Sequence, residues 1–531
     1  MSPPDQNPGA VLPPPALVAT RATPIARERW LALAALLPSL IFLAVVVTPP
    51  LNHDVAAILD FTQRWMAGEA LYLDILDVNP PLIFVLTRGV LALGGALGLA
   101  PIAALLAAVL ALCAASLALI HRLRRGMAEG VIEARCLTFA LPLLMVAAGY
   151  DFAQREHMMI VVALPYLFLA ARRVDGLKTE RWLVLTVALL AATGFVLKPH
   201  FLVIPALIEG YLLWRRGWRA SLADPVPWTI GGVALGYLGA ILLFFPAYVE
   251  VLLPLALTYY LPTAPLTEVI FNERMTPVLV VMLPAAVIAL RGGSHRAGGL
   301  PPMLALTGIG ALAAAIAQQR GWTYHVLPIR LMAGLLLVML IARWLDHGLP
   351  LSRRLRTAPR MAALAALALG LHSVNGSEAP WRELNFARSW PGAISEVLAR
   401  VAPGGRVLVL SPDIDPVYPA LNYANARSTL PTMNLWLFQA FYSRCLADGT
   451  RYRTPEAMGT DERWFHDRVV RDFTTRPPEV LMVARHIWIP HCGGQFSILE
   501  YFGRHTGFAA TLRRYRLVAD FPSYRIFRRE D

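Results

Sequence analysis

Long apolar stretches separated by short polar connections fill the chain from residue 31 to residue 376. Most of these stretches come close to the roughly 20 residues that a helix needs to cross a bilayer. The pattern therefore predicts a polytopic α-helical membrane protein with about 11 spans. The predicted spans cover residues 31–49, 101–120, 136–150, 157–172, 182–197, 199–214, 228–248, 276–290, 301–317, 325–345 and 361–376.

The polar connections fall into two sets that alternate along the chain. One set is strongly basic and contains "HRLRRG" at 121, "ARRVDGLKTER" at 171, "WRRGWR" at 214, "RGGSHR" at 291 and "SRRLRTAPR" at 352. The other contains "YDFAQREH" at 150, "KPH" at 198, residues 249–275 and "QQRGWTYH" at 318. The first set holds roughly three times as many lysines and arginines, and the positive-inside rule places such connections in the cytoplasm. The predicted N-terminus is cytoplasmic and the C-terminus lies outside.

One apolar segment, residues 80–120, is long enough for two crossings, which would break this alternation. Arg88, Gly94, Gly95 and Pro101 interrupt the segment. Non-helical breaks at membrane depth are tolerated where protein or a cavity covers them. We therefore expect residues 80–98 to form a juxtamembrane or re-entrant helix within a first outer loop, residues 50–100. Residues 101–120 then form the true span.

The two ends of the chain differ from its middle. Residues 1–29 are rich in proline and polar side chains, which predicts a disordered cytoplasmic segment before the transmembrane domain, residues 30–376. From residue 377 the charge rises, and "RVLVLS" at 406, "EVLMVA" at 479 and "YRIFRR" at 524 have the pattern of strands. "PGAISEVLARV" and "MNLWLFQAFYSRCLADG" have that of helices, the second ending at Gly449. Residues 377–531 are thus predicted to form a soluble α/β domain on the outer face.

Composition supports this class. Of the 531 residues, 56% are hydrophobic and only 16% are charged, whereas soluble domains are about a quarter charged. The net charge of +13 is explained by topology, so we expect no nucleic-acid partner. The four cysteines include no CxxC pattern, which argues against thiolate metal binding, and a Cys445–Cys492 disulfide stays an open alternative.

The predicted outer loops carry the ionisable residues that invite a functional interpretation, because charge at membrane depth is costly unless it is used or paired. Asp54, in "NHD" directly after the first span, has the position of a general base that takes a proton from an acceptor hydroxyl. The structural alternative is that Asp54 caps the helix that follows it.

Three further loops add cations and a second carboxylate. In "YDFAQREH", Asp151 and Arg155 are spaced to pair on one helix face; alternatively, Arg155 and His157 bind a phosphate beside Asp151 and Glu156. Lys198 and His200 flank a proline between two predicted spans. As an alternative to a functional role, the Lys198 side chain could extend along the membrane surface. "QQRGWTYH" adds Arg320, Tyr324 and His325. The alternative for Tyr324 is that it belongs to the belt of aromatic side chains found at membrane surfaces. No nucleotide-binding or hydrolase motif stands out.

The first outer loop resembles that of the polyprenyl-phosphate-dependent glycosyltransferases of the C superfamily, which include protein mannosyltransferases and lipid A aminoarabinose transferases. The family pattern is Asp, Gly-x-x-x-Tyr-x-Asp and Asn/Lys-Pro-Pro-Leu. Here it corresponds to Asp54, Gly68, Tyr72, Asp74, Asn79, Pro80, Pro81 and Leu82. The next acidic position of the family corresponds to Asp151. The protein mannosyltransferases carry an Asp-Glu pair where this sequence has His53-Asp54, which argues against a protein acceptor.

The resemblance implies a glycosyltransferase-C-like enzyme in the bacterial inner membrane, with its active site on the periplasmic face. It would transfer a hexose or pentose, with inversion, from a polyprenyl-phosphate-linked donor to a cell-envelope glycan or lipid acceptor. Asp54 and Asp151 would be catalytic; Arg155, His157, Lys198, His200, Arg320 and His325 would bind the donor phosphate; His53, Tyr72, Asp74, Glu156 and Tyr324 would bind substrate. No cofactor is required, although a divalent metal ion held by Asp54 and Asp151 stays an open alternative.

Other functions remain alternatives. A lipid-linked oligosaccharide polymerase or ligase also works without nucleotides, but would have a larger outer loop. A transporter or flippase would commonly carry internal repeats, and none is evident in the sequence. A non-catalytic scaffold for envelope assembly would not need the outer-face acids and bases.

Overall fold

The structure of the chain is a computed structural model. It describes residues 24–260, 265–291, 298–347, 357–374, 385–442, 451–485, 487 and 496–530. Cys445, Cys492, the predicted helix end at Gly449 and most of the segment expected to be disordered lie outside these residues. The first helix already begins at Pro24, ahead of the expected domain boundary.

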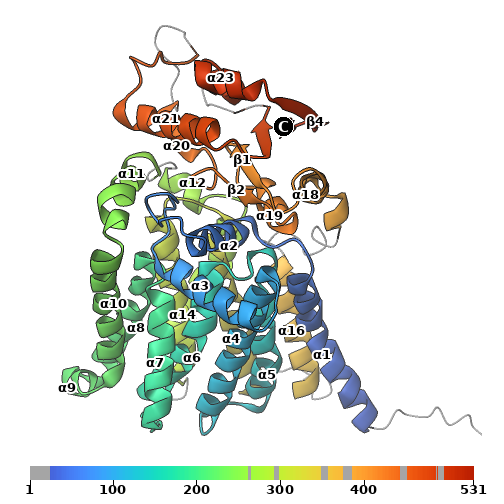
Figure 1. Cartoon of the computed structure of the whole chain (residues 1–531). Coiled ribbons are helices and arrows are strands. Elements are labelled where there is room, and N and C mark those ends of the chain that lie inside the picture. Colours follow the sequence, from blue (N-terminus) through green and yellow to red (C-terminus); the bar gives the residue numbers. More distant parts are fainter. Residues whose placement is uncertain are drawn as a thin grey trace, which may run out of the picture.

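Most of the described residues before the tail form a bundle of apolar helices (Figure 1). Within the described residues, six helices are long and apolar enough to cross a bilayer. They make the protein an integral membrane protein by length and composition. These helices are α1 (Pro24–Val47), α4 (Pro101–Arg124), α6 (Arg155–Val174), α10 (Pro225–Phe244), α14 (Leu300–Ala317) and α15 (Thr323–Asp346).

Shorter helices occupy the other ranges that the sequence predicts as spans. The structure therefore has a helix at every predicted span, although five of these helices are shorter than 18 residues. They are α5 (Val131–Val146), α7 (Arg181–Phe195), α8 (Val203–Arg216), α13 (Met275–Arg291) and α16 (Ala358–Val374). Small helical segments join them: η1 (Gly149–Asp151), η2 (Pro199–Leu202), α9 (Trp218–Leu222), η3 (Tyr248–Leu252), α11 (Leu253–Leu255), η4 (Ala256–Tyr260) and α12 (Leu266–Ile270).

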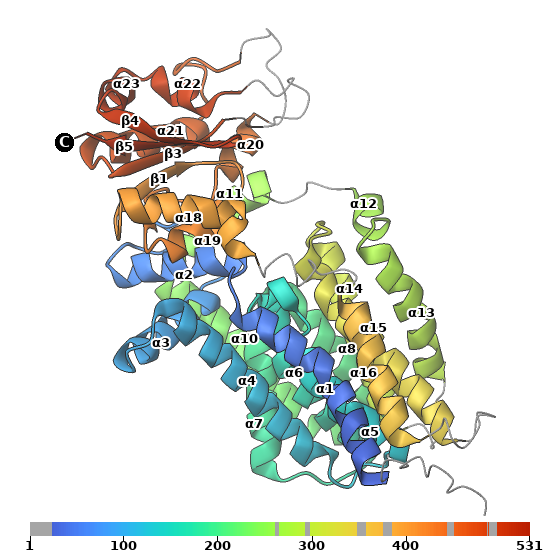
Figure 2. The ribbon, with the colours of Figure 1, turned by 90° about the vertical axis from the view of Figure 1, so that its right-hand side faces the viewer.

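Two helices fill the first predicted outer loop. Helix α2 (His53–Met66) is amphipathic and lies across the upper end of the bundle, between the bundle and the tail (Figures 1 and 2). Helix α3 (Leu82–Ala96) precedes α4 and packs against it, and Pro101 occupies the first turn of α4, where the missing amide N–H costs nothing. The chain thus has a short helix where the sequence suggests a juxtamembrane segment.

The tail is built on a five-stranded sheet in the order β2-β1-β3-β5-β4. Strands β2, β1 and β3 are parallel; β5 pairs antiparallel with β3, and the edge strand β4 pairs antiparallel with β5. Three strands coincide with the strands predicted from the sequence. The tail comprises η5 (Phe386–Arg388), α18 (Trp390–Val401), β1 (Arg406–Leu410), α19 (Val417–Tyr423), β2 (Arg427–Ser428), α20 (Trp436–Phe441), α21 (Thr460–Thr475), β3 (Val480–Ala484), α22 (Ile498–Gly503), α23 (Thr506–Leu512), β4 (Tyr515–Asp520) and β5 (Tyr524–Arg529).

The tail holds α2 by side-chain hydrogen bonds. The Arg64 guanidinium donates to the Leu430 carbonyl at 2.7 Å and pairs with Glu69 at 2.6 Å. The Tyr418 hydroxyl donates to Asp60 Oδ2 at 2.9 Å, and Asn422 Nδ2 donates to the Ala56 carbonyl at 2.9 Å. One face of α2 is therefore covered by the tail.

A second set of contacts fixes the loop that follows α2. The amide of Leu76 donates to the Pro431 carbonyl at 2.7 Å. The Arg468 guanidinium donates to the Leu73 carbonyl at 2.5 Å and lies 3.5 Å from Asp74 Oδ1. The tail thus contacts both α2 and the loop that leads to α3.

Asp60 provides a test of this docking. Burial raises its pKa to about 6, against the attraction of Arg64. The folded state therefore binds a proton that the unfolded state has released, and this stabilisation is complete below about pH 4 and lost as the pH rises through 6. Asp60→Asn keeps an acceptor for Tyr418 without the charge, so we expect it to stabilise the protein at pH 8 by about 2 kcal/mol. The same substitution should change little near pH 4.5.

Thermal unfolding of the detergent-solubilised protein at the two pH values measures this effect, with Glu273→Gln as an exposed control outside this contact. A lower melting temperature of the Asp60→Asn protein at pH 8 would show that the attraction between Asp60 and Arg64 outweighs the cost of burial.

Candidate functional site

The start of α2 is organised by Asn52. Its side-chain Oδ1 accepts hydrogen bonds from the amides of Asp54 at 2.9 Å and Val55 at 3.4 Å, which is the geometry of a helix N-cap. The structural alternative for Asp54 is therefore wrong, because Asn52 is the cap. Asp54 occupies the first turn, where the helix dipole favours a negative charge.

Gln154 connects Asp54 to the second acidic loop. Its Nε2 donates to Asp54 Oδ2 at 2.9 Å and to Asn52 Oδ1 at 2.8 Å, while its Oε1 accepts from Arg155 Nη2 at 3.0 Å. Arg155 Nη2 also lies 3.9 Å from Asp54 Oδ2. All four side chains are buried, so the start of α2 and the start of α6 form one polar cluster.

The charges around Asp54 keep it ionised. Burial raises its pKa, but His53, Arg155, the Gln154 amide and Lys198 together hold the pKa below its usual value. The carboxylate is therefore available as a proton acceptor at neutral pH. A carboxylate with a lowered pKa is a weak base. Its basicity rises when another negative group approaches these cations and reduces their effect on Asp54.

Asp151 lies in the same cluster but makes different contacts. Its Oδ1 accepts from Thr323 Oγ1 at 3.1 Å and from Asn52 Nδ2 at 3.5 Å, while its Oδ2 is buried without a hydrogen-bond partner among the described residues. Burial raises its pKa to about 7. Asp151 does not pair with Arg155, so the i, i+4 pairing predicted as an alternative is not observed. The structure thus brings Asp54 and Asp151 to opposite sides of Asn52.

A buried ion pair lies next to this cluster. Lys198 Nζ contacts Glu156 Oε1 at 2.6 Å and Gln318 Oε1 at 3.2 Å, and it lies 5.3 Å from the ring centre of Tyr324. Lys198 is buried, so it does not extend along the membrane surface. Glu156, predicted to bind substrate, neutralises this lysine instead, and its Oε2 has no partner in the described part of the chain.

The loop before α15 contributes a stacked group. His325 Nδ1 lies 2.7 Å from the Arg320 carbonyl, and its ring stacks on Trp322. The Arg320 guanidinium donates to the Tyr260 carbonyl at 2.6 Å and lies over the Tyr260 ring. Tyr324 packs edge-on against His325. These residues are held together, although Arg320 contacts the η4 segment and not Asp54.

Other predicted site residues have structural roles. The His157 Nδ1 accepts from the Ala153 amide at 3.3 Å and its Nε2 lies 2.9 Å from the Met145 carbonyl, so neither nitrogen is left for a phosphate. Tyr72 is fully buried and donates to the Asn79 carbonyl at 2.7 Å, which fixes the loop. Asp74 is exposed and accepts from the Ala70 amide, on the side that faces the tail.

The remaining two predicted residues are partly buried. His53 Nδ1 lies 2.9 Å from the Tyr150 hydroxyl, and its Nε2 lies 3.7 Å from Asp54 Oδ1. His53 is therefore part of the cluster. The ring of His200 packs against Phe201, and its buried Nε2 has no hydrogen-bond partner among the described residues.

Sequence reasoning assigned no role to three residues of this region: Asn52, Gln154 and Asp77. Asn52 and Gln154 are neutral amides, which a search for titratable groups passes over. Asp77 is buried, accepts two hydrogen bonds from Asn79 through its Oδ1, and has its pKa raised to about 6 by burial. Arg155 and Asp54 are among the charges that act on Asp77. The "DVNPP" run that contains Asp77 was a signal that could have identified it.

The described residues contain no group of three or more His, Cys, Asp or Glu side chains placed to hold a metal ion. Asp54 and Asp151 are joined through Asn52 and Gln154, which donate hydrogen bonds to the carboxylates that a metal would need. Cys113 and Cys136 are free thiols buried in the bundle.

Comparison with solved structures identifies the fold. The chain aligns over 94% of its length with 98% of a chain described as "Crystal Structure of ArnT from Cupriavidus metallidurans in the apo state", with a TM-score of 0.50 and 13% sequence identity. The fold is ArnT-like. It confirms, at the level of the fold, the resemblance to glycosyltransferase-C enzymes seen in the sequence. No protein-family profile and no curated protein sequence matches the chain.

The Lys198–Glu156 pair gives a test of the architecture of this site. Lys198→Met leaves the Glu156 carboxylate buried without its cation, so we expect a loss of about 3–5 kcal/mol in stability. Adding Glu156→Gln removes the unpaired charge, and the double variant should recover most of that loss. Thermal unfolding in detergent measures both. Equal stability of the single and double variants would contradict the pairing.

Proposed function

We propose that the protein transfers a sugar from a polyprenyl-phosphate donor to a cell-envelope glycan or lipid, with inversion, at the periplasmic face of the bacterial inner membrane. In this proposal the chain crosses the membrane 11 times, with a cytoplasmic N-terminus and a periplasmic α/β tail. The observation that carries the proposal is the Asp54 carboxylate, which is ionised and lies 3.9 Å from Arg155 where α2 meets the first turn of α6.

The chemistry follows from these neighbours. An acceptor hydroxyl attacks the anomeric carbon of the donor sugar, and Asp54 takes its proton. The bond between that carbon and the phosphate oxygen breaks, so a lipid phosphate leaves with the electron pair. Cations that face the departing oxygen stabilise its growing negative charge. The phosphate in turn weakens the hold of the cations on Asp54, which raises the basicity of the carboxylate when the donor is bound.

Arg155 is the cation best suited to the phosphate. Its Nε is buried without a hydrogen-bond partner among the described residues, so the guanidinium has a donor to spare. Arg320 likewise has a buried Nε without a partner. In this proposal Lys198, which is paired with Glu156, is a secondary cation, and His325 holds the loop of Arg320 through the Arg320 carbonyl. Asp151 holds Asn52 and Thr323 behind the reacting groups. The ArnT-like fold agrees with the resemblance of the first loop to polyprenyl-phosphate-dependent enzymes.

The decisive variant is Asp54→Asn. It keeps the size of the side chain and an acceptor for Gln154, but it cannot accept a proton, so we expect transfer to fall by about 10³-fold with expression unchanged. Asp74→Asn is the matched control in the same loop and should keep wild-type transfer. Transfer is measured in membranes by loss of sugar from the extracted polyprenyl-phosphate pool. Unchanged transfer by Asp54→Asn would exclude Asp54 as the base.

Lipid extracts of a deletion strain identify the donor. We expect one polyprenyl-phosphate sugar to accumulate while that sugar disappears from an envelope glycan or lipid. Accumulation of a polyprenyl diphosphate oligosaccharide would favour the polymerase or ligase alternative, and an unchanged lipid profile would contradict the proposed donor.

A further inference from the structure

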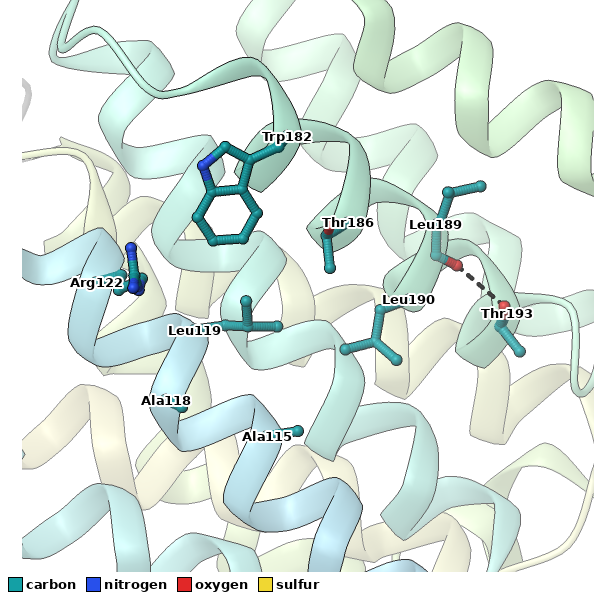
Figure 3. A pocket seen from close by; sticks show the side chains of 9 residues that line it. All are labelled: Ala115, Ala118, Leu119, Arg122, Trp182, Thr186, Leu189, Leu190 and Thr193. Carbon is teal, nitrogen blue, oxygen red and sulfur yellow. Dashed lines mark hydrogen bonds between the residues drawn. The ribbon is translucent and has the colours of Figure 1, made fainter.

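A groove opens on the outside of the helix bundle, away from the Asp54 cluster. It has a volume of about 630 Å³ and lies between α4 and α7 (Figure 3). Alanine and leucine side chains face the space between the two helices, and Arg122 and Trp182 lie together at one end of it. The lining residues are Ala115, Ala118, Leu119 and Arg122 from α4, and Trp182, Thr186, Leu189, Leu190 and Thr193 from α7.

Helices α4 and α7, which line the groove, both pack against α6. The approach of α7 is close: a Cβ atom on Gly194 would lie 2.2 Å from Val162 Cγ2 of α6. The small side chains of Ala115 and Ala118 keep the space on the α4 side open. The groove is therefore a fixed feature of the packing, since the backbones that wall it are held by α6.

The length of the groove fits one leaflet of a bilayer. From Trp182 to Thr193 the wall covers a rise of roughly 16 Å at 1.5 Å per residue. Half of a hydrocarbon core of about 30 Å is nearly the same length. An acyl chain lying in the groove would thus reach from a membrane surface to about the bilayer centre.

The end of the groove at Arg122 is basic and has unused donors. The Arg122 guanidinium lies 5.3 Å from the ring centre of Trp182. Arg122, Arg125 and Arg181 are exposed, and none of their side chains has a hydrogen bond or ion pair within the described residues. The carboxylate at this end, Glu180, accepts a hydrogen bond from the Trp182 indole. Three exposed arginines therefore gather at this end, while the other acid of the adjoining connection, Glu129, is already paired with Arg124.

Arg172 holds this basic end together. At the end of α6 it donates to the carbonyls of Leu123 at 2.8 Å and Arg125 at 2.7 Å, and to Thr179 Oγ1 at 2.9 Å. These bonds tie the end of α4 to the connection that leads into α7. The arginines around Arg122 are thus brought to one place by the fold.

We propose that this groove binds an anionic phospholipid from the leaflet at its basic end. The lipid phosphate contacts Arg122, with Arg125 and Arg181 adding attraction for a net negative headgroup, and one acyl chain lies along Ala118 and Leu190. The basic end lies beside the end of α6 that carries Arg172, opposite the end that carries Arg155. The lipid is therefore a bound component of the membrane domain, and this inference does not depend on the proposed reaction.

Native mass spectrometry of the full-length protein tests the proposal by titration with phosphatidylglycerol and with phosphatidylcholine of the same acyl chains. We expect phosphatidylglycerol to bind more tightly, and Arg122→Gln to weaken it about fivefold, the effect of one arginine at an anionic surface. Phosphatidylcholine binding should change less. Arg135→Gln, which removes an exposed arginine that lies over Phe139 on α5, is the matched control and should bind both lipids as wild type does.

A second variant tests the acyl-chain half of the site. Ala118→Trp fills the groove and should weaken both lipids, whereas Ala103→Trp, exposed on α4 outside the groove, should weaken neither. Size-exclusion profiles matching wild type confirm that each variant is folded. Equal affinity of wild type for the two lipids, or wild-type binding by Arg122→Gln, would overturn the proposal. Displacement of phosphatidylglycerol by an equal concentration of polyprenyl phosphate would overturn it too, because the groove would then take a different lipid.

Discussion

The Gln154 amide is the contact on which the site depends, because it joins two elements about a hundred positions apart in the chain. Its nitrogen binds the cap of α2 and the Asp54 carboxylate, and its oxygen accepts from Arg155. A buried amide that satisfies three partners at once fixes the orientation of each. Without it, Asp54 and Arg155 would be buried charges at a distance of 3.9 Å with no hydrogen bond to set their geometry.

The cost of burying a polar group without a partner also explains how the charged residues around the cluster are arranged. Lys198 is paired with Glu156, and Arg64 with Glu69, since isolated charges at these positions would be expensive to bury. Asp151, Glu156 and Arg155 each keep one buried polar atom without a partner among the described residues. These unsatisfied atoms gather around Asn52 and the start of α6, which is where the proposed reaction needs groups that respond to a substrate.

The helices and strands that could be predicted from the sequence are those marked by a pattern within their own residues. Apolar length located a helix at every predicted span, apolar runs rich in valine and leucine located β1 and β3, and the aromatic and β-branched residues of "YRIF" located β5. Strand β2 has two residues and β4 alternates irregularly, so neither has a pattern to detect. In the site, charge placed Asp54, Asp151 and Arg155 correctly in one cluster. It failed for His157 and Tyr72, because their partners are backbone carbonyls and amides that no side-chain pattern reveals.

The contacts between the tail and α2 have a consequence for the order in which the protein folds during its synthesis. Arg64 and Asp60 belong to α2, yet their partners Leu430 and Tyr418 follow 366 and 358 residues later. While the ribosome makes the helices in between, Arg64 can pair with Glu69, but the Leu430 carbonyl and the Tyr418 hydroxyl are not yet present. Helix α2 and the loop after it can reach their final contacts only after the last quarter of the chain has been made. Assembly of the cluster at Asp54 is therefore a late event, and a chain that stops before residue 418 would carry Asp54 without the contacts that hold its helix.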